Sequence, residues 1–227
     1  MVSYVMIAKR NSKYKINSAV GNQPVFIFDV DQCLYSSDNL IAHEHDHVCN
    51  KFINSTSFDA SDFLLHNLKF NNWQELFYSV CGLHPKRFQD EYDLLDFEKY
   101  MEKDIQLIEQ IKNIKYRKFC FSNGTKKRVE KILKILGMED LFETAFCSDT
   151  EDTDLLLKPK LEAFQFVQNY IGATSSANLY FFDDNIKNVA GGKLSGWNCY
   201  HINKNIKKQI QKAVEALELK SLEKKTI

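Results

Sequence analysis

The chain has few of the residues that mark disordered or low-complexity proteins: its 227 residues include 3 prolines and 8 glycines. It also has no charge excess, because 30 Lys and Arg residues balance 30 Asp and Glu residues. The balanced charge therefore gives no reason to expect a nucleic-acid polymer or a membrane surface as a partner. No apolar run approaches the roughly 18 residues that a membrane span needs. What is present, 44% apolar and 13% aromatic residues, indicates a globular protein with a sizeable core.

The sequence also lacks the paired cysteines that bind metals, since none of its six cysteines belongs to a Cys-x-x-Cys motif. Most of them fall in or beside apolar runs: Cys33, Cys120, Cys147 and Cys199. This placement favours reduced, buried thiols and a cytoplasmic location. Residues 1–24 contain four basic residues and no acid. We interpret them as a polar N-terminal arm rather than a secretion signal.

Short apolar runs alternate with amphipathic segments along most of the chain. The runs predict buried strands over 25–28, 118–121, 144–147, 179–182 and 198–202. The amphipathic segments predict helices over 125–138, 161–171, 185–194 and 205–219. Such alternation is typical of an α/β fold, a doubly wound, Rossmann-like parallel sheet with helices on both faces.

The interval 38–102 breaks this rhythm, because it is rich in aromatic residues and has no convincing strand. We interpret it as an all-helical cap inserted after the first strand, hinged near 36–39 and 98–104. The core would then comprise 25–37 and 103–227. Most of the aromatic residues should form the core of the cap. A few remain candidates for stacking on a nucleobase: Phe63, Trp73, Phe77 and Tyr78.

Two acids follow the first apolar run, since 25–28 leads directly into Asp29 and Asp31 comes two residues later. Ligands of open parallel sheets bind beyond the carboxyl ends of the strands, and alternate residues of an extended chain share a face. Two acids at the end of a buried strand are costly unless a cation or a reacting proton uses them. An isolated Asp-x-Asp would favour a turn or helix-capping role, but together with the polar groups that follow the later runs it leads us to expect that Asp29 and Asp31 are catalytic.

Further polar groups follow the later runs. They are Ser122-Asn123-Gly124, Lys158-Pro159 with Lys160 as the alternative lysine, and Asp183-Asp184-Asn185. Acids from two strands suit a hard cation such as Mg²⁺. A hydroxyl, a lysine and the start of a helix complement phosphate oxygens. Together these groups predict phosphoryl transfer, in which positioning and charge neutralisation dominate.

In this order and spacing, the motifs resemble those of the haloacid dehalogenase (HAD)-like hydrolase superfamily in its phosphatase form, over about residues 25–202. The resemblance implies that Asp29 is the nucleophile that forms an aspartyl phosphate. Asp31 would then protonate the leaving oxygen and later activate water, with Lys158 as the third catalytic residue. The implied phosphate ligands are Ser122, Asn123 and Lys158. The implied Mg²⁺ ligands are Asp29, the main-chain carbonyl of Asp31, Asp184 and Asp183, with Asp184 ranked above Asp183.

Several stretches are similar to the pyrimidine 5′-nucleotidase group of this superfamily, among them Phe-Asp-Val-Asp-Gln-Cys-Leu-Tyr at 28–35 and the segment 136–142. Two departures stand out. Cys33 occupies a position where many phosphatases carry threonine, and Cys81-Gly82-Leu83 replaces a Tyr-Gly-Leu element. A second acid at position 31 favours phosphate esters, because the dehalogenases of the superfamily lack it.

Three histidines in 43–47 look like a metal cluster, because His43 and His47 would share a helix face. No third ligand is evident, so a solvated helix face is the preferred interpretation.

We therefore expect a Mg²⁺-dependent phosphatase of small phosphorylated metabolites, with nucleoside 5′-monophosphates as the preferred class, acting as a monomer or homodimer. The alternatives are a sugar-phosphate phosphatase, a phosphomutase or a non-catalytic binding protein on the same scaffold.

Overall fold

The computed structural model describes residues 1–8, 13, 18–35, 41–55, 70, 72–151, 155–203 and 205–223. Its centre is a six-stranded sheet with the order β1-β4-β3-β2-β5-β6, in which every pair of neighbouring strands is parallel. The strands are β1 (Ser3–Ile7), β2 (Val25–Phe28), β3 (Arg117–Thr125), β4 (Thr144–Ser148), β5 (Leu179–Asp183) and β6 (Asn198–His201). The predicted α/β fold class with a doubly wound parallel sheet is confirmed.

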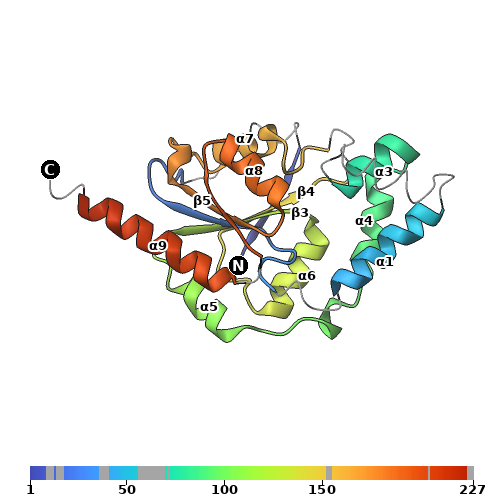
Figure 1. Cartoon of the computed structure of the whole chain (residues 1–227), viewed down its shortest axis with the longest axis horizontal. Helices are drawn as coiled ribbons and strands as arrows, with labels where there is room; N and C mark the ends of the chain where they lie inside the picture. The colour runs from blue at the N-terminus through green and yellow to red at the C-terminus, as the bar shows by residue number, and fades with distance from the viewer. Residues whose placement is uncertain are drawn as a thin grey trace.

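Helices cover both faces of this sheet (Figure 1). One face carries α7 (Leu161–Tyr170) and α8 (Ile186–Leu194), and the other carries α5 (Ile105–Lys112), α6 (Lys126–Leu136) and α9 (Ile206–Glu223). A short 3₁₀ turn, η3 (Ser176–Asn178), precedes β5. The central strand β2 is buried along its whole length, because alternate residues face opposite helix layers. This double burial explains why its sequence is an unbroken apolar run.

The N-terminal residues differ from the expectation of a polar arm over 1–24. Residues 3–7 form β1, which pairs in parallel with β4 from Ser3 opposite Thr144 to Ile7 opposite Ser148. Most of β1 is partly exposed at the edge of the sheet. A five-residue edge strand of this kind lacks the fully apolar character by which the buried strands were found.

Between β2 and β3 the chain forms α1 (Ile41–Asn54), α3 (Trp73–Cys81), α4 (Pro85–Asp93) and the 3₁₀ turn η2 (Phe97–Lys99). The first three helices lie beside one end of the sheet, at the right of Figure 1. They enclose a hydrophobic cluster of their own: Val48, Cys49, Phe52, Leu76, Phe77 and Phe88. The described part of 38–102 is therefore helical, as an inserted cap requires. The exact domain limits stay predictions, and the hinge at 36–39 lies outside the described residues.

The helices after β3 and β5 begin at polar caps close to the carboxyl ends of those strands. Thr125 Oγ1 accepts a hydrogen bond from the Arg128 amide at 3.1 Å, and Asn185 Oδ1 accepts one from the Lys187 amide at 2.9 Å. Such caps satisfy amides that a helix start leaves unpaired. At its other end α6 stops at Gly137, which has a φ of 67° and is the predicted C-cap. Two helix N-termini therefore point toward the edge of the sheet where the acids lie.

The docking of α8 offers a test of this packing. A Cβ on Gly192 would lie 2.6 Å from Cys199 Sγ and 3.2 Å from both Phe164 and Phe181. Because the surrounding core is closely packed, Gly192→Ala should destabilise the protein by about 1–3 kcal/mol, measured by chemical denaturation. Ala190→Leu, on the exposed side of the same helix, should change stability by less than about 0.5 kcal/mol. Equal stability of the two variants would contradict the packing of α8.

Candidate active site

The polar residues predicted to carry the chemistry come together at the carboxyl ends of neighbouring strands. Asp29 follows β2, Ser122 lies in β3 and Asp183 ends β5, and these three strands are adjacent in the order β3-β2-β5. Lys158 reaches the same place from the loop between β4 and α7. All four side chains are at least nine-tenths buried, with exposures of 5%, 0%, 0% and 1% respectively.

Lys158 is the central cation of the group. Its Nζ donates to Asp29 Oδ1 at 2.7 Å, to Asp183 Oδ2 at 2.6 Å and to the Phe121 carbonyl at 2.6 Å. Burial alone would lower the pKa of Lys158, but the Asp183 and Asp29 carboxylates outweigh it and raise that pKa above its usual value. The alternative lysine, Lys160, instead donates to the Leu155 carbonyl at 3.0 Å. Of the two candidates, Lys158 is the one that contacts the acids.

Asn123 has a different contact from the one expected of a phosphate ligand. Its Oδ1 accepts from the Lys158 amide and its Nδ2 donates to the Lys158 carbonyl, both at 2.9 Å. This pair of hydrogen bonds fixes the main chain on both sides of the Lys158 Cα. The side chain of Asn123 therefore positions the lysine, and it is already occupied where the sequence predicted contact with substrate.

Asp183 and Asp184 both belong to the acidic group, with different surroundings. Asp183 accepts from the Asn185 amide at 2.8 Å and from Asn188 Nδ2 at 3.1 Å, in addition to Lys158. Asp184 is only partly buried and lines the cavity described below. Burial and the charge of Asp183 raise the pKa of Asp184 to about 7. Burial also raises the pKa of Asp29 well above its usual value, although Lys158 opposes this shift.

Asp29, Asp183 and Asp184 are suitably placed for one cation. Each offers an oxygen, and these oxygens lie within 4.8 Å of one another. Three carboxylates against a single ammonium leave negative charge that is costly to bury. Hard divalent cations such as Mg²⁺ bind through carboxylate oxygens. The donor set and its charge therefore fit a divalent cation.

Asp31 is held separately, on the side of β3 and α6. Its Oδ2 accepts from Ser122 Oγ at 3.3 Å and its Oδ1 accepts from the Tyr35 hydroxyl at 3.3 Å. Ser122 Oγ in turn accepts from the Gly124 amide at 2.8 Å. After Asp31 the chain turns through Gln32, whose φ of 56° is left-handed. The carboxyl groups of Asp29 and Asp31 thus have different partners, as different chemical roles require.

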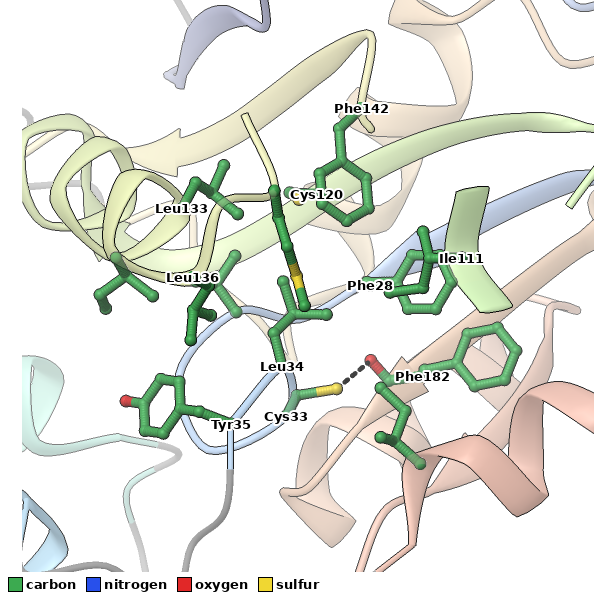
Figure 2. Close-up of a cluster of buried hydrophobic side chains, with 14 of the residues drawn as sticks. Phe28, Cys33, Leu34, Tyr35, Ile111, Cys120, Leu133, Leu136, Phe142 and Phe182 are labelled. Atoms are coloured by element: carbon green, nitrogen blue, oxygen red, sulfur yellow. Dashed lines mark hydrogen bonds between the residues drawn. The ribbon is translucent and has the colours of Figure 1, made fainter. Parts of the chain in front are cut away.

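The departure at Cys33 has a clear structural counterpart (Figure 2). The thiol is 2% exposed and donates to the Phe182 carbonyl at 3.5 Å. The same carbonyl accepts from the Asp29 amide at 2.8 Å. Burial, followed by the charge of Asp29, raises the pKa of Cys33, so the thiol stays protonated and remains a donor. Cysteine therefore fastens the loop after β2 to the end of β5.

A cavity of about 180 Å³ opens over these acids. Its core side includes Asp29, Asp31, Lys158 and Asp184, and its cap side includes His45, Trp73, Gln74, Phe88, Gln89 and Tyr92. Of the aromatic residues proposed for base stacking, Trp73 lines this cavity, Phe77 is buried in the cap core and Tyr78 is 37% exposed. Phe63 lies outside the described residues.

The three histidines of α1 do not all lie on the same side of the helix, and the one that faces the cavity is not one of the pair considered as metal ligands. His43 and His47 are exposed, whereas His45 faces the cavity and contacts the Tyr92 ring with centroids 4.5 Å apart. Burial lowers the pKa of His45, and the charge of Arg128 lowers it further. The histidine that sequence reasoning passed over is therefore the one in the site.

Arg128 is the second residue that sequence reasoning missed. It lies in a basic run that resembles a solvated helix face, yet it is only 4% exposed and lines the cavity. Its spacing held the clue, because Arg128 lies four residues before Ile132 and eight before Leu136, on the buried stripe of α6.

Comparison with known proteins identifies a protein family and a curated relative that this chain resembles. A family model described as haloacid dehalogenase-like hydrolase matches residues 24–196. Phosphate metabolism protein 8 of Saccharomyces cerevisiae is 29% identical over 184 residues, which are 73% of this chain and 57% of that protein. The chain thus spans just over half the length of this curated relative.

Solved structures share the fold. The HAD-hydrolase YfnB from Bacillus subtilis, bound to magnesium, has a TM-score of 0.52 at 17% identity, covering 80% of this chain and 87% of that one. The L-2-haloacid dehalogenase from Xanthobacter autotrophicus has a TM-score of 0.51 at 14% identity, covering 79% and 77%. At these identities the likeness concerns the fold alone. The family model, however, spans most of the chain and includes Asp29, Lys158 and Asp183, so the chain belongs to the haloacid dehalogenase-like hydrolases.

Proposed function

We propose that the protein is a Mg²⁺-dependent phosphatase that hydrolyses small phosphate monoesters through an aspartyl phosphate on Asp29. The observation that carries this proposal is the pair of separate carboxyl groups at Asp29 and Asp31. Asp29 faces Lys158 and the other acids, while Asp31 is held by Tyr35 and Ser122. A phosphate ester needs both a nucleophile and a proton donor for its leaving oxygen. The dehalogenases that the chain resembles need only the nucleophile.

The proposed reaction has two halves. Asp29 attacks phosphorus, the bond to the ester oxygen breaks, and Asp31 gives its proton to that oxygen. Asp31 then removes a proton from water, which attacks the phosphorus of the aspartyl phosphate and releases inorganic phosphate and free Asp29. The Lys158 ammonium neutralises charge on the transferring group, and the Ser122 hydroxyl donates a hydrogen bond to it. Magnesium, when bound, supplies positive charge that keeps the neighbouring carboxylates ionised and compensates the phosphoryl oxygens.

We further propose nucleoside 5′-monophosphates as substrates. This proposal rests on the similarity to the pyrimidine 5′-nucleotidase group and on the aromatic side chains of Trp73 and Tyr92 in the cavity wall. Neither a nucleic-acid polymer nor a membrane is proposed as a partner. In the described part of the chain, no helix has the length and apolar character to cross a bilayer. A cytoplasmic location and a monomeric or homodimeric state stay predictions.

Replacing the nucleophile tests the reaction. Asp29→Asn should lower kcat for p-nitrophenyl phosphate with Mg²⁺ by at least about 10³-fold, because an amide cannot form the aspartyl phosphate. The thermal midpoint should stay similar or rise, since one buried carboxylate of the cluster is removed. Asp140→Asn makes the same chemical change at an acid that is 88% exposed, and should leave kcat unchanged. Wild-type turnover by Asp29→Asn would contradict the assignment.

The substrate class is tested by phosphate release from a panel of nucleotides and sugar phosphates in Mg²⁺. Nucleoside monophosphates should have the highest kcat/KM. A preference for sugar phosphates would replace the substrate proposal, and the absence of phosphate release from every compound would favour a binding protein.

Removal of Mg²⁺ by a chelator should stop turnover reversibly, and activity that survives chelation would contradict the metal proposal.

The acid cluster also predicts a dependence of stability on pH and metal. The folded protein raises the pKa of Asp184 to about 7, so it binds that proton more tightly than the unfolded chain. Protonated Asp184 therefore contributes to the stability of the folded protein. This contribution is fully present below about pH 4 and is lost as the pH rises through about 7. In chelator at pH 8, Asp184→Asn should raise Tm by about 2–4 °C per kcal/mol of relieved repulsion.

Asp184→Asn also tests whether Asp184 contributes to the stabilisation of the protein by Mg²⁺. Saturating Mg²⁺ should raise Tm of the wild type through binding to the folded state and raise Tm of Asp184→Asn less. Differential scanning calorimetry at pH 8 measures both effects. Equal Mg²⁺ shifts in the two proteins would show that Asp184 is not a ligand.

A further inference from the structure

Arg128 joins the cap to the core inside the active-site cavity. Its Nη1 donates to Gln89 Oε1 at 2.6 Å and lies 3.4 Å from Asp93 Oδ1. Its guanidinium carbon lies 4.2 Å from the centroid of the Tyr92 ring. These three partners occupy positions i, i+3 and i+4 of α4, which is one face of that helix. A single side chain of α6 therefore contacts three neighbouring residues on the inner face of α4.

The same guanidinium also faces Asp31. Arg128 Nε lies 3.5 Å from Asp31 Oδ1, slightly beyond the length of an ordinary N–H···O hydrogen bond. Among the described residues Nε is buried and has no hydrogen-bond partner. A buried donor without a partner is costly, so a shift of a few tenths of an ångström toward Asp31 would be favourable. The interaction becomes strongest when Asp31 is ionised.

Gly124 leaves the space in which these groups meet. A Cβ at this position would lie 2.8 Å from Arg128 Nη2, 3.0 Å from Arg128 Nε and 3.0 Å from Asp31 Oδ2. Its φ is not in the left-handed region, so the requirement for glycine here is one of space rather than of backbone conformation. The turn after β3 is thus shaped to admit the contact between the arginine and the acid.

Charge balance supports a shared role for the two acids around Arg128. Asp93 is 5% exposed in its side chain, and its Oδ2 also accepts from Thr125 Oγ1 at 2.7 Å. A buried guanidinium is tolerated only when it is paired and hydrogen-bonded. Arg128 therefore needs the α4 acid in place, and Asp31 in turn depends on where Arg128 is held.

We propose that Arg128 is a positioning residue for Asp31, and that it makes proton donation by Asp31 depend on α4 being docked against α6. This inference rests on the proposed phosphatase function and deepens it. Arg128 does not touch the reacting phosphorus. It orients the Asp31 carboxyl group and stabilises the carboxylate that remains after the leaving oxygen has taken its proton. Withdrawal of α4 would remove Gln89, Tyr92 and Asp93 from Arg128 and free the guanidinium to leave Asp31.

Leaving-group dependence distinguishes this role from a merely structural one. The probes are p-nitrophenyl phosphate, whose leaving group departs without a proton, and phenyl phosphate, whose leaving group needs one. With Mg²⁺, Arg128→Gln should lower kcat for phenyl phosphate at least about tenfold more than for p-nitrophenyl phosphate. Arg128→Lys, which keeps the buried positive charge, should show a smaller difference between the two esters. Equal losses on both esters would overturn the proposal.

Lys131→Gln is the matched control. Lys131 lies on α6, and its Nζ donates to the Leu95 carbonyl just beyond α4 at 3.1 Å, but the residue has no contact with Asp31. It should alter kcat by less than about twofold on either ester, as expected for a surface change away from the chemistry. A leaving-group effect in Lys131→Gln as large as that in Arg128→Gln would also overturn the proposal.

A second measurement does not depend on turnover. Hydrogen exchange of the α4 amides should be faster in Arg128→Gln than in the wild type and unchanged in Lys131→Gln, because Arg128 contacts Gln89, Tyr92 and Asp93 of α4, whereas the Lys131 ammonium contacts the Leu95 carbonyl beyond the helix. Unchanged exchange in Arg128→Gln would overturn the link between α4 and α6. A wild-type protein that hydrolyses neither ester would instead overturn the proposed function, so the two failures are distinguishable.

Discussion

The buried ammonium of Lys158 is the interaction on which the site depends. It joins Asp29 after β2, the Phe121 carbonyl in β3 and Asp183 at the end of β5, with each contact between 2.6 and 2.7 Å. Without this cation, the ends of adjacent strands would present buried carboxylates to one another with nothing to balance them. Asn123 fixes the main chain of Lys158, and Asn188 supports Asp183. The surrounding residues therefore serve mainly to hold one lysine in place.

Lys158 alone does not neutralise the group, and this imbalance gives the site its chemical character. Asp184 adds a third carboxylate within reach of a common cation. Asp31 is excluded from that group and is held by Tyr35, Ser122 and Arg128. One set of acids is thus arranged for a metal and a nucleophile, and the remaining acid for a proton. The cap helix α4 is linked to Asp31 through Arg128.

The sequence predicted the residues that lie at the ends of fully buried strands, because acids at such a position are costly unless a cation or a reacting proton uses them. Asp29 and Asp183 were found in this way, whereas Lys158, in the loop between β4 and α7, was found from its Lys-Pro context. The edge strand β1 escaped notice because half-exposed residues carry a weaker pattern. Arg128 was missed because a basic run on an amphipathic helix resembles a solvated surface, and its burial depends on α4, which is distant in sequence. For the same reason the hydrogen bonds of the Asn123 side chain with the Lys158 main chain were not predicted, since Lys158 is 35 residues away.

Trapping the aspartyl phosphate on Asp29 would test the proposed mechanism. Asp31→Asn should still accept a phosphoryl group from p-nitrophenyl phosphate, whose leaving group needs no proton, but should release it slowly because water is no longer activated. Acid quenching followed by borohydride reduction and peptide mass spectrometry locates the modified residue. Homoserine should appear at position 29, in step with p-nitrophenol release. Phosphoryl transfer to another residue, or stoichiometric release of p-nitrophenol with Asp29 unmodified, would contradict the proposed mechanism.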